Sequence, residues 1–212
     1  TDRKSGLQFG IGGVFSFSKN NYKMKLTNLD NRIVRRDHDS FHKIIGGGSI
    51  KATKWWFDEM KLEAVLMKTR QEVQGIDLDV REACNHSTSV VTAFSLKRKN
   101  FFLDGLDFDF DAGYVWGWYG LQDKAKHRYD WDGRELPPVS SFGGEQNNYP
   151  SDGKNKSKEF ISKFNMGYTI DEHHSINLNI YADRTRLNPS DSLMDKALGF
   201  KSNFPSKMTT VT

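Results

Sequence analysis

The sequence has very little cysteine, few apolar residues and no long hydrophobic run. Cys84 is the only cysteine among 212 residues, so no disulfide can form within the chain. No apolar run approaches the ~18–20 residues of a membrane-spanning helix, which excludes a helical membrane protein. Only 36% of the residues are hydrophobic, whereas a globular domain has about 45–50% apolar residues when glycine is counted. A large apolar core is therefore not expected.

The aromatic content and the charge distribution argue against two further classes, disordered proteins and nucleic-acid-binding proteins. Aromatic residues make up 13% of the chain, which argues against disorder. The formal net charge is +4, but the charged residues are spread along the chain instead of gathering on one helix face. This is weak support for a nucleic-acid partner, and we expect none. The sequence indicates an ordered chain whose apolar residues are few and large.

The dominant hydrophobic period is two residues, which indicates β-strands. In LDFDFDAGYVWGWYG, residues 106–120, the residues Asp107, Asp109 and Asp111 alternate with apolar residues that give way to tyrosine and tryptophan. Similar alternation occurs in residues 7–17, 44–57, 60–69, 90–97, 160–170 and 176–183, and the last residues, KMTTVT, fit a further strand. We therefore expect roughly eight strands in a single segment, residues 1–212, that is a fragment of a longer chain.

Helix signals are poor. The segment DEMKLEAVLMKTR contains good helix formers, but it also fits the strand series, and we assign it to a strand. Residues 190–200, SDSLMDKALGF, begin with an N-cap serine and close with a glycine, so one short surface helix is expected there. The sequence thus predicts an all-β protein with almost no helix.

Long and short connections between the expected strands alternate along the chain. The long connections are residues 18–42, 70–88, 120–157 and 185–206, and the tight ones lie near residues 57–59, 102–105 and 171–174. In an antiparallel up-and-down meander, this order places every tight turn at one end of the sheet and every long loop at the other. A soluble β-sandwich has no reason for such an order, whereas an outer-membrane barrel has short turns on its inner side and long outer loops. The predicted fold is therefore a segment of a transmembrane outer-membrane β-barrel.

The barrel interpretation also explains the two faces of residues 106–120. The apolar face would contact lipid through Leu106, Phe108, Phe110 and Ala112, and would end in an outer aromatic girdle of Tyr114, Trp116 and Trp118. Asp107, Asp109 and Asp111 would line a hydrated lumen, balanced by basic residues on neighbouring strands such as Lys97. An inner girdle would come from the aromatic residues of the tight turns, which are Trp55, Trp56, Phe57, Phe101 and Phe102.

Two hairpins resemble those of a known family. The segments IIGGGSIKATKWWFDEMKLEAVLMKTRQEVQG and KFNMGYTIDEHHSINLNIYADRTRLNPSDSLM are similar to the barrel hairpins of TonB-dependent outer-membrane receptors. The resemblance implies roughly eight strands of a 22-stranded barrel in the outer membrane of a Gram-negative bacterium. It implies import of a siderophore, haem, cobalamin or a glycan, driven by TonB through an N-terminal box and plug that are not recognisable here. The implied partners are outer-membrane lipid and lipopolysaccharide, TonB and a small nutrient ligand.

No catalytic or metal site is evident in the sequence. Side chains two apart on a strand, as in the series Asp107–Asp111, lie about 6.5–7 Å apart, too far to share a small cation. Cys84, Asn85 and His86 fall in the expected loop 70–88, and no second pair of ligands follows at a fitting spacing. We therefore expect no cofactor, no metal ion and no enzyme activity.

The long loops contain the candidate binding residues. Loop 18–42 has six basic residues against three acidic ones, a net charge of +3 that suits an anionic ligand or lipopolysaccharide phosphates. Loop 120–157 interleaves aromatic and basic residues, which can stack on a ligand and donate hydrogen bonds to it. The candidate ligand-binding residues are Arg35, Arg36, Arg128, Tyr129, Trp131 and Arg134.

Two other functions stay open from the sequence. One is a complete small outer-membrane barrel with a structural role, although such a chain should end on a closing strand with a terminal aromatic residue, and this one ends at Thr212. The other is a soluble β-rich module that binds a carbohydrate or another ligand, with Trp116, Trp118 and Trp131 as stacking platforms. The leading hypothesis is an outer-membrane receptor that transports iron or another nutrient.

Overall fold

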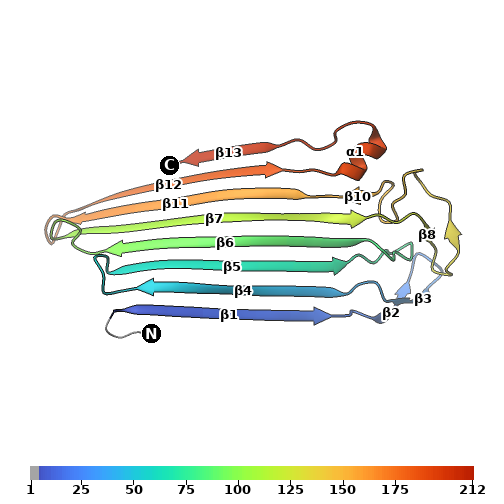
Figure 1. Ribbon diagram of the computed structural model, residues 1–212, viewed down its shortest axis with the longest axis horizontal. Coiled ribbons are helices and arrows are strands. Elements are labelled where there is room, and N and C mark those ends of the chain that lie inside the picture. The colour runs from blue at the N-terminus through green and yellow to red at the C-terminus, as the bar shows by residue number, and fades with distance from the viewer. Residues whose placement is uncertain (1–4) are drawn as a thin grey trace.

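The computed structural model describes residues 5–212 as a single layer of antiparallel strands. Eight strands cross the sheet in chain order, and each pairs with the next one in this series (Figure 1). They are β1 (Leu7–Ser18), β4 (Phe41–Ala52), β5 (Glu59–Glu72), β6 (Cys84–Arg98), β7 (Leu106–Asp123), β11 (Asn155–Thr169), β12 (Ser175–Asn188) and β13 (Ser206–Val211). The short strand β10 (Ser151–Asp152) also pairs with β7. The predicted all-β antiparallel meander is confirmed.

Smaller elements lie in the long connections. Two short hairpins are formed by β2 (Tyr22–Leu26) with β3 (Arg32–Arg36), and by β8 (Arg128–Tyr129) with β9 (Glu135–Leu136). The short helix α1 (Ser192–Leu198) was predicted, but its expected serine N-cap was wrong, because the carboxylate of Asp191 accepts the hydrogen bond from the Met194 amide. In the part of the chain that the structure describes, no helix is long and apolar enough to cross a membrane.

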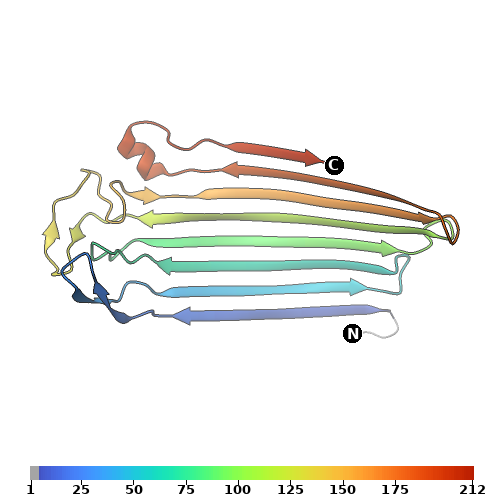
Figure 2. The same cartoon turned by 180° about the vertical axis from the view of Figure 1, so that it is seen from behind.

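The tight turns and the long loops lie at opposite ends of the sheet (Figures 1 and 2). The turns that join β4 to β5, β6 to β7 and β11 to β12 share one end. At the other end, the Arg32 guanidinium donates a hydrogen bond of 3.1 Å to the carbonyl oxygen of Trp131. This contact confirms that the loops 18–42 and 120–157 lie at the same end of the sheet.

The alternation of residues 106–120 survives in the structure because β7 pairs with β6 and β11 without a bulge. Phe110 lies between Leu96 and Phe164 on one face of the sheet, which we call the outward face. Asp109 lies between Lys97 and Asn165 on the other face, the inward face. The prediction that the aromatic residues lie opposite the carboxylates is confirmed for Phe108, Phe110 and Trp116 against Asp107, Asp109 and Asp111.

Neither face of the sheet is covered by a second layer within residues 5–212 (Figure 2). The buried apolar residues are few, and most lie in the loops or at strand ends: Leu26, Val34, Ala52, Val80, Ala83, Cys84 and Ala125. Large apolar side chains of the outward face are instead exposed, with Phe9 68% and Ile11 96% accessible. An apolar surface of this extent requires an apolar environment or a partner.

Aromatic rings join the tight turns to one another. The Trp56 ring lies 4.6 Å from the Phe57 ring and 5.5 Å from the Phe101 ring, measured between centroids. Phe101 stacks on Phe108 at 4.9 Å. Aromatic pairs at such distances each contribute about 0.5–1.5 kcal/mol beyond their buried area. The turns β4–β5 and β6–β7 are therefore held together by aromatic rings in the region that the sequence marked as rich in aromatic residues.

The assignment of Cys84, Asn85 and His86 to a loop was wrong, because these residues form the beginning of β6. The pairing of β6 with its neighbours continues as far as Glu72 and Gln122, beyond the apolar part of these strands. From Asn85 to Ser89, the side chains of β6 itself are polar on both faces. A hydrophobic period therefore cannot mark the strand here, and only the hydrogen-bonded neighbours define it.

The apolar part of the outward face crosses the strands at a slant, and we call it the apolar belt. On β1 it extends from Leu7 to Phe17, and on β12 it extends from Ile176 to Ala182. A row of directly paired residues that starts at Ile11, in the middle of the belt on β1, reaches β12 at Arg184, beyond the belt.

The size of this slant follows from strand geometry. The middle of the belt on β12 lies about five residues from that row, or roughly 17 Å along the strands, and six strand spacings separate β1 from β12, or roughly 29 Å. The belt is therefore inclined by about 30° to the perpendicular of the strands, close to the ~35–45° tilt of strands in membrane barrels.

Candidate functional site

The long loops form a structured cap at one end of the sheet, which we call the loop cap. It comprises residues 19–40, 73–83, 124–154 and 189–205. Figure 1 shows these segments gathered at the ends of the strands. Because loops usually contribute binding residues on a rigid scaffold, the loop cap is the candidate functional site.

Arg32 connects the two small hairpins of the loop cap. Besides its hydrogen bond to Trp131, its guanidinium forms an ion pair with Asp132. The hydrogen bond from Arg32 holds the pKa of the Asp132 carboxyl below its usual value. The Trp131 indole N–H in turn donates a 3.0 Å hydrogen bond to the carbonyl oxygen of Ile76. The β2–β3 hairpin, the β8–β9 hairpin and the loop 73–83 are thereby joined.

Two buried carboxylates fasten the loop 124–154, one to the end of β7 and the other to the loop 73–83. Asp123, fully buried, accepts hydrogen bonds from the backbone N–H groups of Glu145, at 2.9 Å, and Gln146, at 2.8 Å. Glu145, 3% exposed, accepts from the backbone N–H groups of Arg81, at 2.9 Å, and Ala83, at 2.7 Å, and also from that of Glu82. Backbone donors of this kind satisfy a buried carboxylate without a cation. Both side chains are thus structural.

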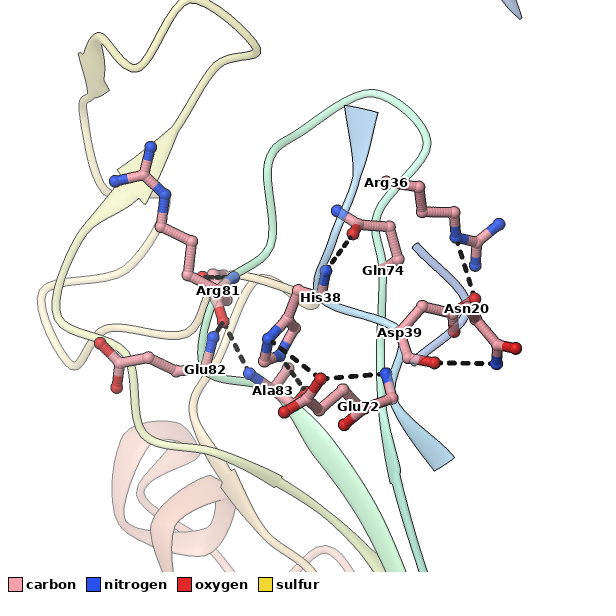
Figure 3. A network of polar contacts seen from close by, with 11 residues as sticks. Asn20, Arg36, His38, Asp39, Glu72, Gln74, Arg81, Glu82 and Ala83 are labelled. Carbon is pink, nitrogen blue, oxygen red and sulfur yellow. Dashed lines mark hydrogen bonds and ion pairs between the residues drawn. The ribbon is translucent and has the colours of Figure 1, made fainter. Parts of the chain in front are cut away.

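Figure 3 shows how His38 joins the loop 19–40 to the end of β5 and to the loop 73–83. Its backbone N–H donates a 2.9 Å hydrogen bond to the Gln74 side chain, and its ring Nε2 lies 3.0 Å from the Ala83 carbonyl oxygen. Its Nδ1 lies 3.8 Å from Glu72, which also accepts a 3.0 Å hydrogen bond from the Ser40 backbone. Burial acts to raise the pKa of the Glu72 carboxyl, but the hydrogen bonds from Ser40 and the nearby His38 hold it below its usual value.

Asp191 ties the last loop to the sheet. Its carboxylate, in a residue 6% exposed, accepts hydrogen bonds from the Ser151 hydroxyl at 2.5 Å and from the Asp152 backbone N–H at 3.0 Å. The same carboxylate caps α1 through the Met194 amide, at 3.0 Å. One side chain therefore positions α1 against β10, and every large loop segment has at least one such fixed point.

The six residues predicted to bind a ligand fall into two groups. Arg35 and Arg36 lie on β3, and there Arg36 forms a 3.2 Å ion pair with Asp39 while Arg35 donates a 2.8 Å hydrogen bond to Asn21. The other four lie in the β8–β9 hairpin: Arg128, Tyr129, Trp131 and Arg134. The structure thus gathers these four into one hairpin and places the β3 pair on a separate one.

Within the β8–β9 hairpin, side chains differ in their freedom to meet a ligand. The Arg134 side chain is 77% exposed. One face of the Tyr129 ring is occupied, because the Arg81 guanidinium lies 3.8 Å above it. The Trp131 indole N–H already donates to Ile76. Arg134 is therefore the most accessible cation among the predicted residues of this hairpin.

Sequence reasoning missed the residues that build the loop cap, above all Arg32, Asp123 and Glu145. Charge counting included Arg32 but gave no information about which carboxylate it meets. A local signal existed for Glu145, because Gly143 and Gly144 precede it with φ of 96° and 98°, values that only glycine adopts easily. A double glycine before a carboxylate indicates a tight turn that orients the carboxylate side chain. It does not indicate which distant residues the side chain contacts.

Comparisons with family models, with curated proteins and with solved structures find no match for this chain. Within residues 5–212, no group of three or more His, Cys, Asp or Glu side chains is arranged to hold a metal ion. The function must therefore be argued from the faces of the sheet and from the loop cap.

Proposed function

We propose that this chain forms part of the wall of an outer-membrane β-barrel that receives and imports a small nutrient, of the TonB-dependent receptor type. The observation behind the proposal is the slanted apolar belt on the outward face. A soluble sheet packs its apolar face on a second layer, whereas a barrel wall exposes an apolar band to lipid and crosses the membrane with tilted strands. The inclination of about 30° supports the second arrangement.

The inward face supports a hydrated lumen. Near β6 it contains a hollow of about 450 Å³ whose charged lining residues are Glu59, Lys61, Glu63, Lys97, Asp111 and Lys163. Ion pairs of 2.6 Å between Lys51 and Glu59, and of 2.9 Å between Lys61 and Glu63, neutralise part of this surface. Charges of both signs suit water, and they would be costly in the packed interior of a sandwich.

The loop cap supports the receptor role. Asp123, Glu145 and Asp191 fix its backbone, so a ligand would meet a surface that is already ordered and would lose less conformational entropy on binding. The exposed Arg134 guanidinium lies 3.9 Å from Asp132 and faces solvent, so it can donate hydrogen bonds to an anionic group of the ligand. The ligand classes we propose are those of the family: a ferric siderophore, haem, cobalamin or a glycan, with TonB supplying the energy.

Cysteine labelling of the full chain in intact bacterial cells tests the orientation. In a Cys84→Ser background, Arg134→Cys in the loop cap is expected to react with a membrane-impermeant maleimide. Glu172→Cys, which is also solvent-exposed but lies in a tight turn at the opposite end, is expected to react only after the outer membrane is permeabilised. Equal labelling of the two cysteines in intact cells would contradict a wall that crosses the membrane, as would labelling of neither before lysis.

Uptake measurements test the transport role. Cells that lack the full chain are expected to lose energised uptake of one of the four ligand classes, while cells that produce it accumulate that ligand. Because TonB depends on the proton gradient, an uncoupler is expected to stop accumulation and to leave surface binding intact. Retention of accumulation in the presence of the uncoupler would rule out the TonB-driven mechanism, and an unchanged uptake of all four classes would rule out the importer.

A further inference from the structure

A group of cations lies on the outward face directly beside the apolar belt, and we call it the basic patch. On β11 the outward side chains change from Phe160 to lysine, and on β12 they change from Ala182 to arginine. All members of the patch are exposed: Lys156, Lys158, Arg184, Arg186 and Lys207. The patch lies on the loop-cap side of the belt.

The register makes the patch electrostatically unfavourable by itself. Lys158 pairs directly with Arg186, and Arg186 pairs directly with Lys207, so three cations stand side by side on three neighbouring strands. Like charges that face each other across strands destabilise a sheet. An anion that neutralises the row therefore stabilises it.

No carboxylate in the described part of the chain provides this neutralisation. Among residues 5–212, none of the five cations forms an ion pair, and Arg186 donates only to the side chain of Asn188, at 3.3 Å. The outward positions of β7, β11, β12 and β13 include no Asp or Glu in the described strands. The acidic residues Glu159 and Asp183 belong to the same strands but alternate onto the inward face.

The surroundings of the patch define what kind of anion fits. The paired row Lys158, Arg186 and Lys207 begins at Trp116 of β7. The next outward row toward the tight turns contains Tyr114 and Phe160 and continues to Arg184 on β12. Neighbouring strands lie about 4.8 Å apart, so the three cations span roughly 10 Å, the width of a headgroup with more than one phosphate. A ligand that satisfies both rows must be anionic at one end and apolar at the other.

We propose that the basic patch binds the phosphate groups of a membrane lipid with at least two phosphates on its headgroup, whose acyl chains lie along the apolar belt below Tyr114 and Phe160. The inference rests on the proposed function, since it needs the outward face to meet lipid. Arg186 occupies the centre of the site, between Lys158 and Lys207, and its guanidinium can donate two parallel hydrogen bonds to one phosphate. Trp116 closes the row at the level where indole rings favour the membrane interface.

The test uses the full chain purified in a non-ionic detergent and titrated with lipid A that has two phosphates, or with the same lipid after its phosphates are removed. The dissociation constant and the number of bound lipids are measured by native mass spectrometry. The wild-type chain is expected to bind the phosphorylated lipid at least about tenfold more tightly than the dephosphorylated lipid. The variant Lys158→Gln/Arg186→Gln/Lys207→Gln is expected to lose this preference.

Two further variants control the test. Lys43→Gln/Lys97→Gln/Lys163→Gln removes three cations from the inward face, including one on β11, and is expected to bind phosphorylated lipid as the wild type does. Lys158→Arg/Lys207→Arg keeps the charges and is expected to retain binding. An equal loss in the inward-face variant would show attraction by net charge alone and would overturn the site. Displacement of the lipid by inorganic phosphate would overturn the lipid as its occupant.

The outcomes separate this site from the proposed function. If the wild-type chain is released from membranes by high salt and alkaline washing, the outer-membrane proposal fails and the lipid site fails with it. If the chain stays in the membrane but binds both forms of the lipid equally, only the lipid site is wrong.

Discussion

Phe110→Arg is expected to lower the yield of membrane-folded full chain sharply, while Asp109→Asn leaves it nearly unchanged. Phe110 lies on the outward face between Leu96 and Phe164, near the middle of the apolar belt on β7. A cation at this depth costs about 2–4 kcal/mol in a membrane barrel. Asp109 lies on the inward face between a lysine and an asparagine, and an amide there remains hydrated.

The two substitutions are a matched pair, because they change adjacent residues of one strand and both alter charge by one unit. Folded protein can be measured as the heat-modifiable fraction on a gel after membrane extraction. Loss of assembly in Asp109→Asn together with tolerance of Phe110→Arg would show that the faces are assigned in reverse. In that case the carboxylates of β7 would have a structural role on a buried face.

Glu145→Ala is expected to open the loop cap while the sheet stays intact. The substitution removes the acceptor for three backbone N–H groups, those of Arg81, Glu82 and Ala83. Leaving a buried donor without a partner costs about 1–3 kcal/mol for each group. Water that reaches the opened loop binds these N–H groups and lowers the total cost, so we expect a local destabilisation of about 2–4 kcal/mol.

Hydrogen exchange measures this opening directly. Amides of residues 81–83 are expected to exchange 30- to 1,000-fold faster in Glu145→Ala, roughly the factor that 2–4 kcal/mol implies. Glu82→Ala is the control. Glu82 lies between Arg81 and Ala83, and its exposed carboxylate accepts none of these hydrogen bonds. Glu145→Gln keeps one oxygen acceptor and should fall between the two. Equal exchange in Glu145→Ala and in Glu82→Ala would show that the buried carboxylate does not hold the loops.

The sheet was predictable because each strand shows its hydrophobic period within one short segment of the sequence. A strand with two different faces shows its period in a single segment, as residues 106–120 do. A tight turn makes the two strands that it joins neighbours, and the alternation of short and long connections places the long loops at one end of a meander. The same rule failed at Cys84–His86, because the side chains of β6 from Asn85 to Ser89 are polar on both faces and show no period. Strand ends therefore depend on neighbours that the segment itself does not reveal.

The loop cap was not predictable in the same way because its contacts join residues that are far apart in the sequence. Arg32 meets Asp132 across 100 residues, and Glu145 meets Ala83 across 62. No sequence period relates such positions. The sequence does not show which of the basic residues in loop 18–42 pairs with Asp132. The sequence did predict that the loops are long and charged and that they lie at one end of the sheet. Composition and the order of long and short connections are sufficient for these features.

The slant of the apolar belt sets the shape of any closed wall built from this sheet. A shift of about five residues over six strand steps is a little under one residue per strand, so the shear number of the closed cylinder would be close to its strand count. Each added strand is then shifted by the same amount along its neighbour. The circumference grows with strand number while the inclination of the strands stays the same, and a wide pore has the same wall geometry as a narrow one.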